Sequence, residues 1–234
     1  MIPRLVGFLL VLIGGSPMLW AAQPVGLLLL EEGSVQLLRG EQPHLLYKNG
    51  QSLRLQEGDR IITGAASRAR VSFIAAGEEI MLFSKTHLDL SGPDPTGTRR
   101  RLRLPKGKAR IRVDRTQGQL TLTCLTTLVT VQKAELVVES EEGSVRVSLF
   151  QGRAEVSNLA YPEELRRLKA GRWTQVNRMS PPDPPRSLNP AAKLDLLSKE
   201  SGQLVEGLPP LQPAEVRHEN LPEVRHENLR PLTR

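Results

Sequence analysis

The chain has 234 residues and a formal net charge of +7; 39% of its residues are hydrophobic and only 3% are aromatic. This length is enough to bury a full core and suits one domain with appendages, or at most two. The positive charge favours acidic surfaces as partners, and the one cysteine, Cys124, excludes an internal disulfide.

The first 22 residues have the organisation of a secretory signal. Arg4 supplies a positive start, Leu5 to Ile13 an apolar stretch and Ala21–Ala22 a small-residue exit. The apolar stretch is too short for a membrane-spanning helix of ~20 residues. We therefore expect residues 1–22 to be removed and the mature chain to be periplasmic, without a transmembrane span; an uncleaved inner-membrane anchor is the alternative. Export also excludes nucleic acid as a partner.

From Gly33 to Ser157, hydrophobic residues recur at every second position. Leu120, Leu122 and Cys124, for example, alternate with two threonines, which is the pattern of a half-buried strand. Glycine-containing turn signals divide this region at intervals of roughly 8–12 residues, too short for helices to alternate with strands. The sequence therefore predicts an all-β sandwich or roll of many short strands within residues 23–178.

One block of this region, residues 55–73, combines turn residues with alternating hydrophobic residues (LQEGDRIITGAASRARVSF). Glycines in it can take positive φ at tight turns, and the aspartate can accept hydrogen bonds from neighbouring backbone N–H groups. We expect Ile61, Val71 and Phe73 to face the core. The turn residues form a predicted structural motif of Gly58, Asp59, Thr63 and Gly64.

This block resembles the opening of the FecR domain, in which leucine, glycine–aspartate, isoleucine, threonine–glycine and serine–arginine–alanine precede a strand. The similarity extends from about Gly33 to Val176. It implies a periplasmic β domain, and in signalling members a relay between an outer-membrane transporter and a cytoplasmic sigma factor. Those members carry a sigma-binding segment before a membrane span. Only a few residues precede the apolar stretch here, so we expect a stand-alone exported form.

The chain departs from the family pattern at Val131–Leu136, where a glycine of the pattern is absent. Without glycine, a tight turn at this point is disfavoured. We therefore expect a continuous strand there.

The strongest candidate site is a run of cations that begins at Arg99 and contains no acid before Asp114. A turn at Pro105–Gly107 would make a hairpin that presents five of these cations on one face, with the hydrophobic residues on the other. One interpretation is an anion- or partner-binding surface; the other is a solvated face that protects a sheet edge from aggregation. The candidate residues are Arg99, Arg100, Arg101, Arg103, Lys106, Lys108, Arg110 and Arg112.

The sequence contains no local signature of catalysis: no nucleophile elbow, HExxH, CxxC or phosphate-cradling glycine loop. His44 and His87 fall in predicted strands, and Cys124 lies on the apolar phase of one. Clustered acids from Glu139 to Glu142 are read as a strand end and turn, with a cation or acid–base role as the alternative. We expect no enzymatic activity, no catalytic residue, no cofactor and no metal. A metal site would need His218 and His226 to meet in a folded tail.

Towards the C-terminus the pattern of alternation ends. Two short helices are expected, at about 162–168 after a leading proline and at about 190–199 after an Asn189 cap. The proline-rich segment 180–185 between them is predicted to be a semi-rigid linker, within an appendage of residues 179–234 that ends in a poorly ordered tail.

The tail contains a repeat. EVRHENL occurs at residues 215–221 and again at 223–229. One interpretation is a recent duplication under little constraint; the other is a partner-binding motif presented twice for avidity.

Together these features predict an exported FecR-like scaffold or regulatory module that acts by protein–protein interaction. The alternative is an envelope protein that binds polyanions, such as lipopolysaccharide or cell-wall polymer, through a basic β face. A hydrolase with a non-local site is a third class. The expected partner is an envelope protein or an anionic envelope polymer.

Overall fold

The computed structural model describes residues 23–74, 77–92, 99–114 and 118–189. Within these residues all the regular secondary structure is β, in fifteen strands. The predicted all-β fold is therefore confirmed. The predicted signal segment, the helix at 190–199 and the EVRHENL repeat lie outside the described residues.

The strand pairing forms two layers. Layer A contains β1 (Gly26–Glu32), β4 (Ser52–Leu55), β6 (Arg68–Phe73), β7 (Glu78–Leu82), β14 (Arg172–Asn177) and β15 (Arg186–Ser187). Layer B contains β2 (Val35–Arg39), β3 (Gln42–Leu46), β5 (Arg60–Thr63), β8 (His87–Ser91), β10 (Gln119–Cys124) and β13 (Tyr161–Lys169). Three long strands run through both layers: β9 (Arg99–Asp114), β11 (Thr127–Glu141) and β12 (Ser144–Asn158).

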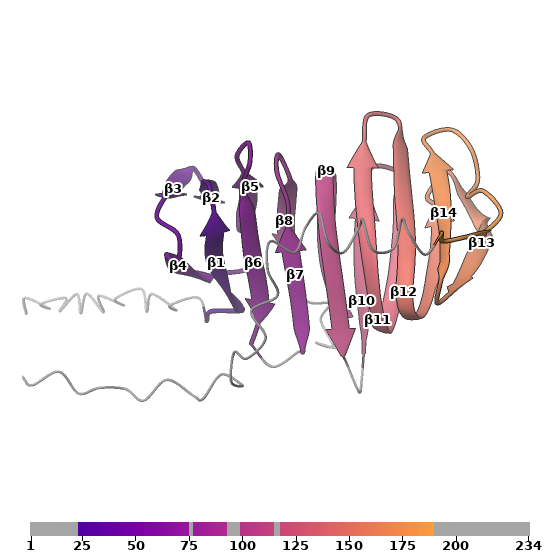
Figure 1. The fold of residues 1–234 in the computed structure, drawn as a ribbon, viewed down its shortest axis with the longest axis horizontal. Coiled ribbons are helices and arrows are strands. Elements are labelled where there is room, and N and C mark those ends of the chain that lie inside the picture. The colour runs from indigo at the N-terminus through magenta and orange to yellow at the C-terminus, as the bar shows by residue number, and fades with distance from the viewer. Residues whose placement is uncertain (1–22, 75–76, 93–98, 115–117, 190–234) are drawn as a thin grey trace, which may run out of the picture.

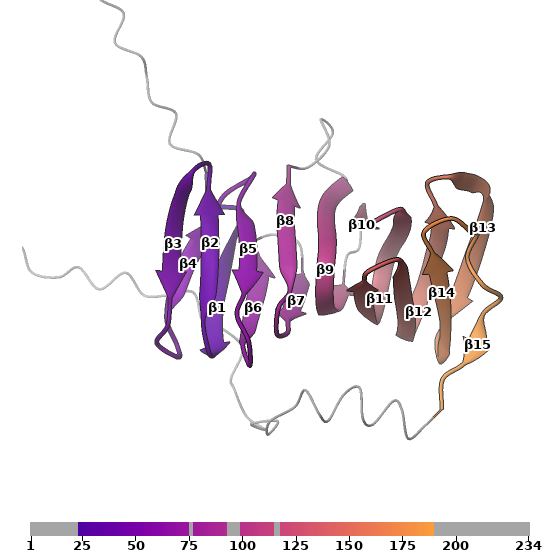
Figure 2. The same cartoon turned by 90° about the horizontal axis from the view of Figure 1, so that it is seen from above.

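The two layers lie face to face. Both extend along the long axis of the molecule, from β3 and β4 at one end to β13 and β14 at the other (Figure 1; Figure 2). Layer A has the order β15-β14-β12-β11-β9-β7-β6-β1-β4. Layer B has the order β3-β2-β5-β8-β9-β10-β11-β12-β13. All pairings are antiparallel except that of β9 with β10.

A single hydrophobic core fills the space between the layers. It takes Leu28 and Val71 from layer A and Ile61 and Leu88 from layer B, all fully buried. These residues alternate with exposed or half-buried neighbours along their strands, as the period of two predicted. Each fully buried large aliphatic side chain contributes about 1.5–3 kcal/mol, so this core is the main source of stability.

The predicted hairpin at Pro105–Gly107 is wrong, because β9 continues through these residues. Its first half, Arg99–Lys106, pairs with β8 and β10 in layer B, and its second half, Gly107–Asp114, pairs with β7 and β11 in layer A. Gly107 makes the bend possible with a φ of +100°, and a side chain there would collide with Thr86. The chain bends from one layer into the other instead of reversing.

β11 and β12 cross between the layers in the same way. Their pairing register shifts between Val131 and Ala134, where Gly152 of β12 has a φ of +82°. A β-bulge of this kind bends a strand and lets it change sheets. The expectation that β11 continues through 131–136 without a turn is confirmed.

The helix predicted at 162–168 is also wrong, because these residues form the edge strand β13. β13 pairs with the second half of β12, from Arg153↔Lys169 to Asn158↔Tyr161. Backbone pairing with an existing sheet edge overrides the local helix signals. Pro162 and a series of charged side chains suit an exposed edge, since both discourage further strand addition.

The proline-rich segment that follows makes specific contacts with the sandwich. We call Ser180–Leu188 the C-terminal strap. The side-chain amide of buried Asn158 donates to the Ser180 carbonyl at 2.7 Å, and Thr174 Oγ1 donates to the Asp183 carbonyl at 2.7 Å. Pro182 is buried. The strap therefore packs along β14, where a semi-rigid linker had been expected.

Candidate functional site

Asp59, from the predicted structural motif, is a fully buried carboxylate. It accepts hydrogen bonds from the Gln56 backbone N–H at 2.8 Å and from Nε and Nη2 of Arg39 at 2.9 and 2.8 Å. The hydrogen bond to Asp59 raises the pKa of Arg39, and burial opposes it. The ion pair ties β2 to the turn before β5. The partner Arg39 lies 20 residues away, so the sequence pattern did not reveal it.

Thr63 and Gly64 join three parts of the fold. The Thr63 hydroxyl donates to the Phe83 carbonyl at 2.5 Å and accepts the Thr86 backbone N–H at 2.8 Å. Gly64 does not have the positive φ that was expected; a side chain at this position would collide with Ser34 Oγ. Gly58 does have positive φ, at +84°. These contacts give the motif residues structural roles.

The bend in β9 divides the five cations that were expected to share one face between two opposite faces of the sandwich; these cations are Arg101, Arg103, Lys108, Arg110 and Arg112. In the first half of the strand Leu102 and Leu104 are buried in the core, and in the second half Ala109, Ile111 and Val113 are. The buried phase thus changes from even to odd residue numbers across the bend. Arg101 and Arg103 therefore point outward from layer B, whereas Lys108, Arg110 and Arg112 point outward from layer A.

Acidic side chains of β11 neutralise the cations on the layer A side. Lys108 Nζ lies 3.1 Å from Glu139 Oε1. Arg110 Nε donates to Glu135 Oε1 at 2.9 Å, and Arg112 Nη2 lies 3.7 Å from the same oxygen. Glu135 was not among the predicted site residues, and Glu139 had been read as part of a strand end and turn, with a cation or acid–base role as the alternative. The sequence signal that could have found them is that Glu135, Val137 and Glu139 lie at every second position, and therefore on one side of β11. The register that pairs β11 with β9 was needed as well.

Arg100 has a separate role inside the sandwich. Its side chain is only 13% exposed, and its Nε lies 2.9 Å from Glu78 Oε2, which is fully buried. Its guanidinium carbon also lies 4.2 Å from the centre of the Phe73 ring. Arg100 therefore belongs to the interior of the fold, unlike its neighbours in sequence.

Four cations remain on the outer side of layer B. We call this surface the basic face and define it as Arg99, Arg101, Arg103 and Lys106, all of which are exposed. No ion pair is recorded for Arg101, Arg103 or Lys106 within the described part of the chain.

The strands beside the basic face carry small polar side chains and one acid. Arg101 lies opposite Ser91 of β8 and Thr121 of β10, and Arg103 lies opposite Asp89 and Thr123. The Asp89 carboxylate is already held by Arg60 Nε at 2.8 Å. The basic face is therefore a strip of β-sheet with an excess of positive charge, edged by polar groups.

The remaining candidates for chemistry occupy structural positions. Cys124 is fully buried, and this burial raises the pKa of its thiol, against a smaller lowering effect of a backbone hydrogen bond with Leu104. Among residues 23–74, 77–92, 99–114 and 118–189, no three His, Cys, Asp or Glu side chains are grouped to hold a metal ion. His44 and His87 lie in β3 and β8, as predicted from the sequence.

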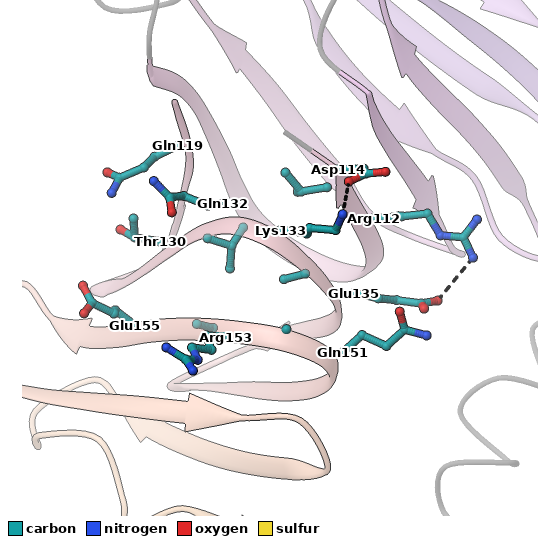
Figure 3. Close-up of a pocket in the computed structure, with 15 residues that line it drawn as sticks. Arg112, Asp114, Gln119, Thr130, Gln132, Lys133, Glu135, Gln151, Arg153 and Glu155 are labelled. Atoms are coloured by element: carbon teal, nitrogen blue, oxygen red, sulfur yellow. Dashed lines mark ion pairs between the residues drawn. The ribbon is translucent and has the colours of Figure 1, made fainter. Parts of the chain in front are cut away.

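A second feature, which the sequence did not predict, is a hollow of about 710 Å³ beside the layer crossings of β11 and β12. Figure 3 shows its charged side chains, with Lys133 Nζ 2.9 Å from Asp114 Oδ1 and Arg112 reaching Glu135. We call this surface the polar hollow. Its polar lining consists of Arg112, Asp114, Gln119, Thr130, Gln132, Lys133, Glu135, Gln151, Arg153 and Glu155.

Comparison with known families supports the resemblance seen in the sequence. A family model described as "FecR protein" matches residues 59–155, from the buried Asp59 to the second half of β12. Residues 59–155 are therefore similar to the FecR domain. The matched region is shorter than the region of resemblance, residues 33–176. β1, β2 and β14 lie outside the matched region, yet they pair into the same two layers.

Two crystal structures of a "putative anti-sigma factor" from Parabacteroides distasonis ATCC 8503 share this fold. Each has a TM-score of 0.51 and 18% sequence identity and covers 61% of this chain. The matched region is 64% and 65% of those two chains, so it spans just under two thirds of their length. No curated protein sequence matches the chain. None of the described residues forms a helix long and apolar enough to cross a membrane.

Proposed function

We propose that this FecR-like domain is an exported interaction module that binds an acidic protein in the periplasm through its basic face. The observation that carries the proposal is the division of β9, which pairs three cations with glutamates in layer A and leaves Arg101, Arg103 and Lys106 as excess positive charge in layer B. The FecR match and the likeness to a protein described as a putative anti-sigma factor favour action by protein contact.

The shape of the basic face favours a protein surface over a polyanion. Asp89 and the threonines of β10 interrupt the positive charge, so the face has a fixed pattern of donors, acceptors and cations. Complementary charge patterns give specificity in protein interfaces. A polymer of repeated phosphates or carboxylates would be matched better by an uninterrupted row of cations. Lipopolysaccharide or cell-wall polymer is therefore the competing outcome.

The partner can be captured by placing a photo-crosslinking amino acid at Thr121, which lies opposite Arg101 on the neighbouring strand. Irradiated intact cells should give an adduct with an acidic protein. The double change Arg101→Gln and Arg103→Gln should reduce the yield by roughly 5–30-fold, the effect of about 1–2 kcal/mol. The matched control is Arg172→Gln with Arg178→Gln, which removes two exposed charges outside β9.

The outcomes separate the possible functions. A protein adduct that depends on Arg101 and Arg103 and weakens with added salt supports the proposal, because exposed charges are screened over ~8 Å at physiological ionic strength. An adduct with lipopolysaccharide or cell-wall polymer supports the polyanion alternative. Equal yields from the basic-face variant and the control would contradict binding through the basic face. Edge protection is excluded as its role, because β9 pairs with β8 on one side and β10 on the other.

The proposed compartment has its own test. Cleavage of residues 1–22 would give a mature N-terminus near Ala22 or Gln23 in the periplasmic fraction. Mass spectrometry of the isolated protein reads this end directly. An intact Met1 in the membrane fraction would contradict cleavage and favour the anchored form.

A further inference from the structure

The polar hollow has balanced charge, which distinguishes it from the basic face. Three cations and three carboxylates line it, together with three glutamine side chains. Two of the cations are paired across it, Lys133 with Asp114 and Arg112 with Glu135. No ion pair is recorded for Arg153 in the described part of the chain, and it is exposed at the rim. Such a surface suits an extended peptide that carries both signs of charge and many hydrogen-bonding groups.

The C-terminal strap brings the end of the described chain to this hollow. The Leu188 backbone N–H donates to the Gly171 carbonyl at 2.9 Å, and the Gly171 N–H donates to the Leu149 carbonyl at 2.8 Å. Leu149 lies two residues before Gln151 in β12, and Gln151 lines the hollow. The chain therefore continues beyond Asn189 from a point close to the rim.

The sequence that follows contains a segment of matching chemistry. In each copy of EVRHENL, at 215–221 and 223–229, two glutamates flank an arginine and a histidine, and an asparagine follows. The segment has both signs of charge in close alternation and lacks a long apolar run. Its glutamates can pair with Arg153, and its arginine can compete with Lys133 for Asp114 or with Arg167 for Glu155.

We propose that one copy of the EVRHENL repeat binds in the polar hollow of the same molecule. The 25 residues between Asn189 and Glu215 act as a tether with a root-mean-square span of roughly 25–30 Å if flexible. Such a tether holds the repeat at an effective concentration in the millimolar range. Weak, charge-balanced contacts are then sufficient for occupancy. This assignment is independent of the basic face.

The presence of two copies of the repeat has a further consequence. While one copy occupies its own hollow, the other is available to the hollow of a second molecule or to another protein. The tail thus competes with any external peptide of the same chemistry. The duplication then has a function, because it allows binding within the molecule and between molecules at the same time.

Disulfide trapping in the full-length protein tests the proposal. Cysteine is introduced at Gln151 in the hollow and at Asn220 in the first repeat, while the native Cys124 is buried and does not compete. The matched control places the hollow cysteine at Glu41 instead, in the exposed turn between β2 and β3, and these two strands lie at the end of the molecule away from β13 and β14 (Figure 2). Under mild oxidation the intramolecular disulfide should form roughly tenfold faster from position 151 than from position 41.

Charge reversal checks the recognition itself. Arg153→Glu should slow trapping at position 151, and Glu219→Arg in the same chain should restore part of the rate. Gln132→Cys provides a second hollow position if Gln151→Cys does not fold. The proposal would be overturned if the disulfide formed at equal rates from positions 151 and 41. It would also be overturned if the charge reversals left the rate at position 151 unchanged. Trapping only between molecules, with a rate that rises with protein concentration, would overturn binding within one chain.

Discussion

At the scale of single residues, Asp59 in the turn before β5 and Asp89 in β8 show how burial determines the contribution of an ion pair. Asp59 is fully buried and held by Arg39 and a backbone N–H, whereas the pair of Asp89 with Arg60 lies on the surface. Asp59→Asn should lower the free energy of unfolding by about 2–4 kcal/mol, because it breaks a largely buried pair. Asp89→Asn should cost at most ~1 kcal/mol. Urea unfolding of the two variants measures this difference, and equal losses would contradict the structural role of Asp59.

The buried Cys124 predicts a pH dependence of stability. Burial raises the pKa of its thiol in the folded protein above the value of ~8.5 in an unfolded chain. Below that pH both states hold the proton and no stability is lost. As the pH rises above ~8.5 only the unfolded thiol ionises, so the free energy of unfolding should fall by up to about 1.4 kcal/mol per pH unit from this group. Cys124→Ala should remove this slope in unfolding curves measured from pH 8 to 10.

At the scale of elements, the bend in β9 depends on Gly107. Its φ of +100° and the closeness of Thr86 leave no room for a side chain. Gly107→Ala should therefore destabilise the protein by about 2 kcal/mol or more. Gly50→Ala is the control, because Gly50 also has positive φ, +82°, but open space around it; it should cost about 1–2 kcal/mol. A smaller loss at Gly107 than at Gly50 in thermal unfolding would show that the bend tolerates a side chain.

The same strand shows which features could be predicted from the sequence. Alternation identified β9 as strand and assigned Leu102 and Ile111 to the core correctly, because burial imposes a period of two. The local sequence Pro105–Gly107 is compatible both with a hairpin turn and with a bend from one layer into the other. Only the strands that pair with β9 before and after these residues distinguish the two. Glu135, Arg39 and the polar hollow escaped prediction for the same reason: each depends on residues brought together by register across 20 or more positions.

At the scale of the whole molecule, the C-terminal strap predicts where the folded unit ends. It holds β14 through Asn158, Thr174 and the short strand β15. A chain ended after Asn189 should still unfold in one cooperative transition, at most slightly below the melting temperature of the full-length protein, because it loses only the weakly bound repeat. A chain ended after Ser180 should unfold at a lower temperature, with a loss of about 2 kcal/mol from the lost contacts and the exposed β14 edge. Equal melting temperatures for the two truncations would show that the strap adds no stability.

Because β9, β11 and β12 each belong to both layers, neither layer can detach while the other stays intact. To separate the layers, the strand structure would have to be disrupted where these three strands cross, at Gly107, near Ala134 and at Gly152. Slow hydrogen exchange should therefore report one common opening free energy for core amides in β6, β8 and β12, where two independent sheets would give two values. A force applied to one layer would act directly on the other through the continuous backbone of these strands. A partner bound to one face would therefore change the stability of the opposite face.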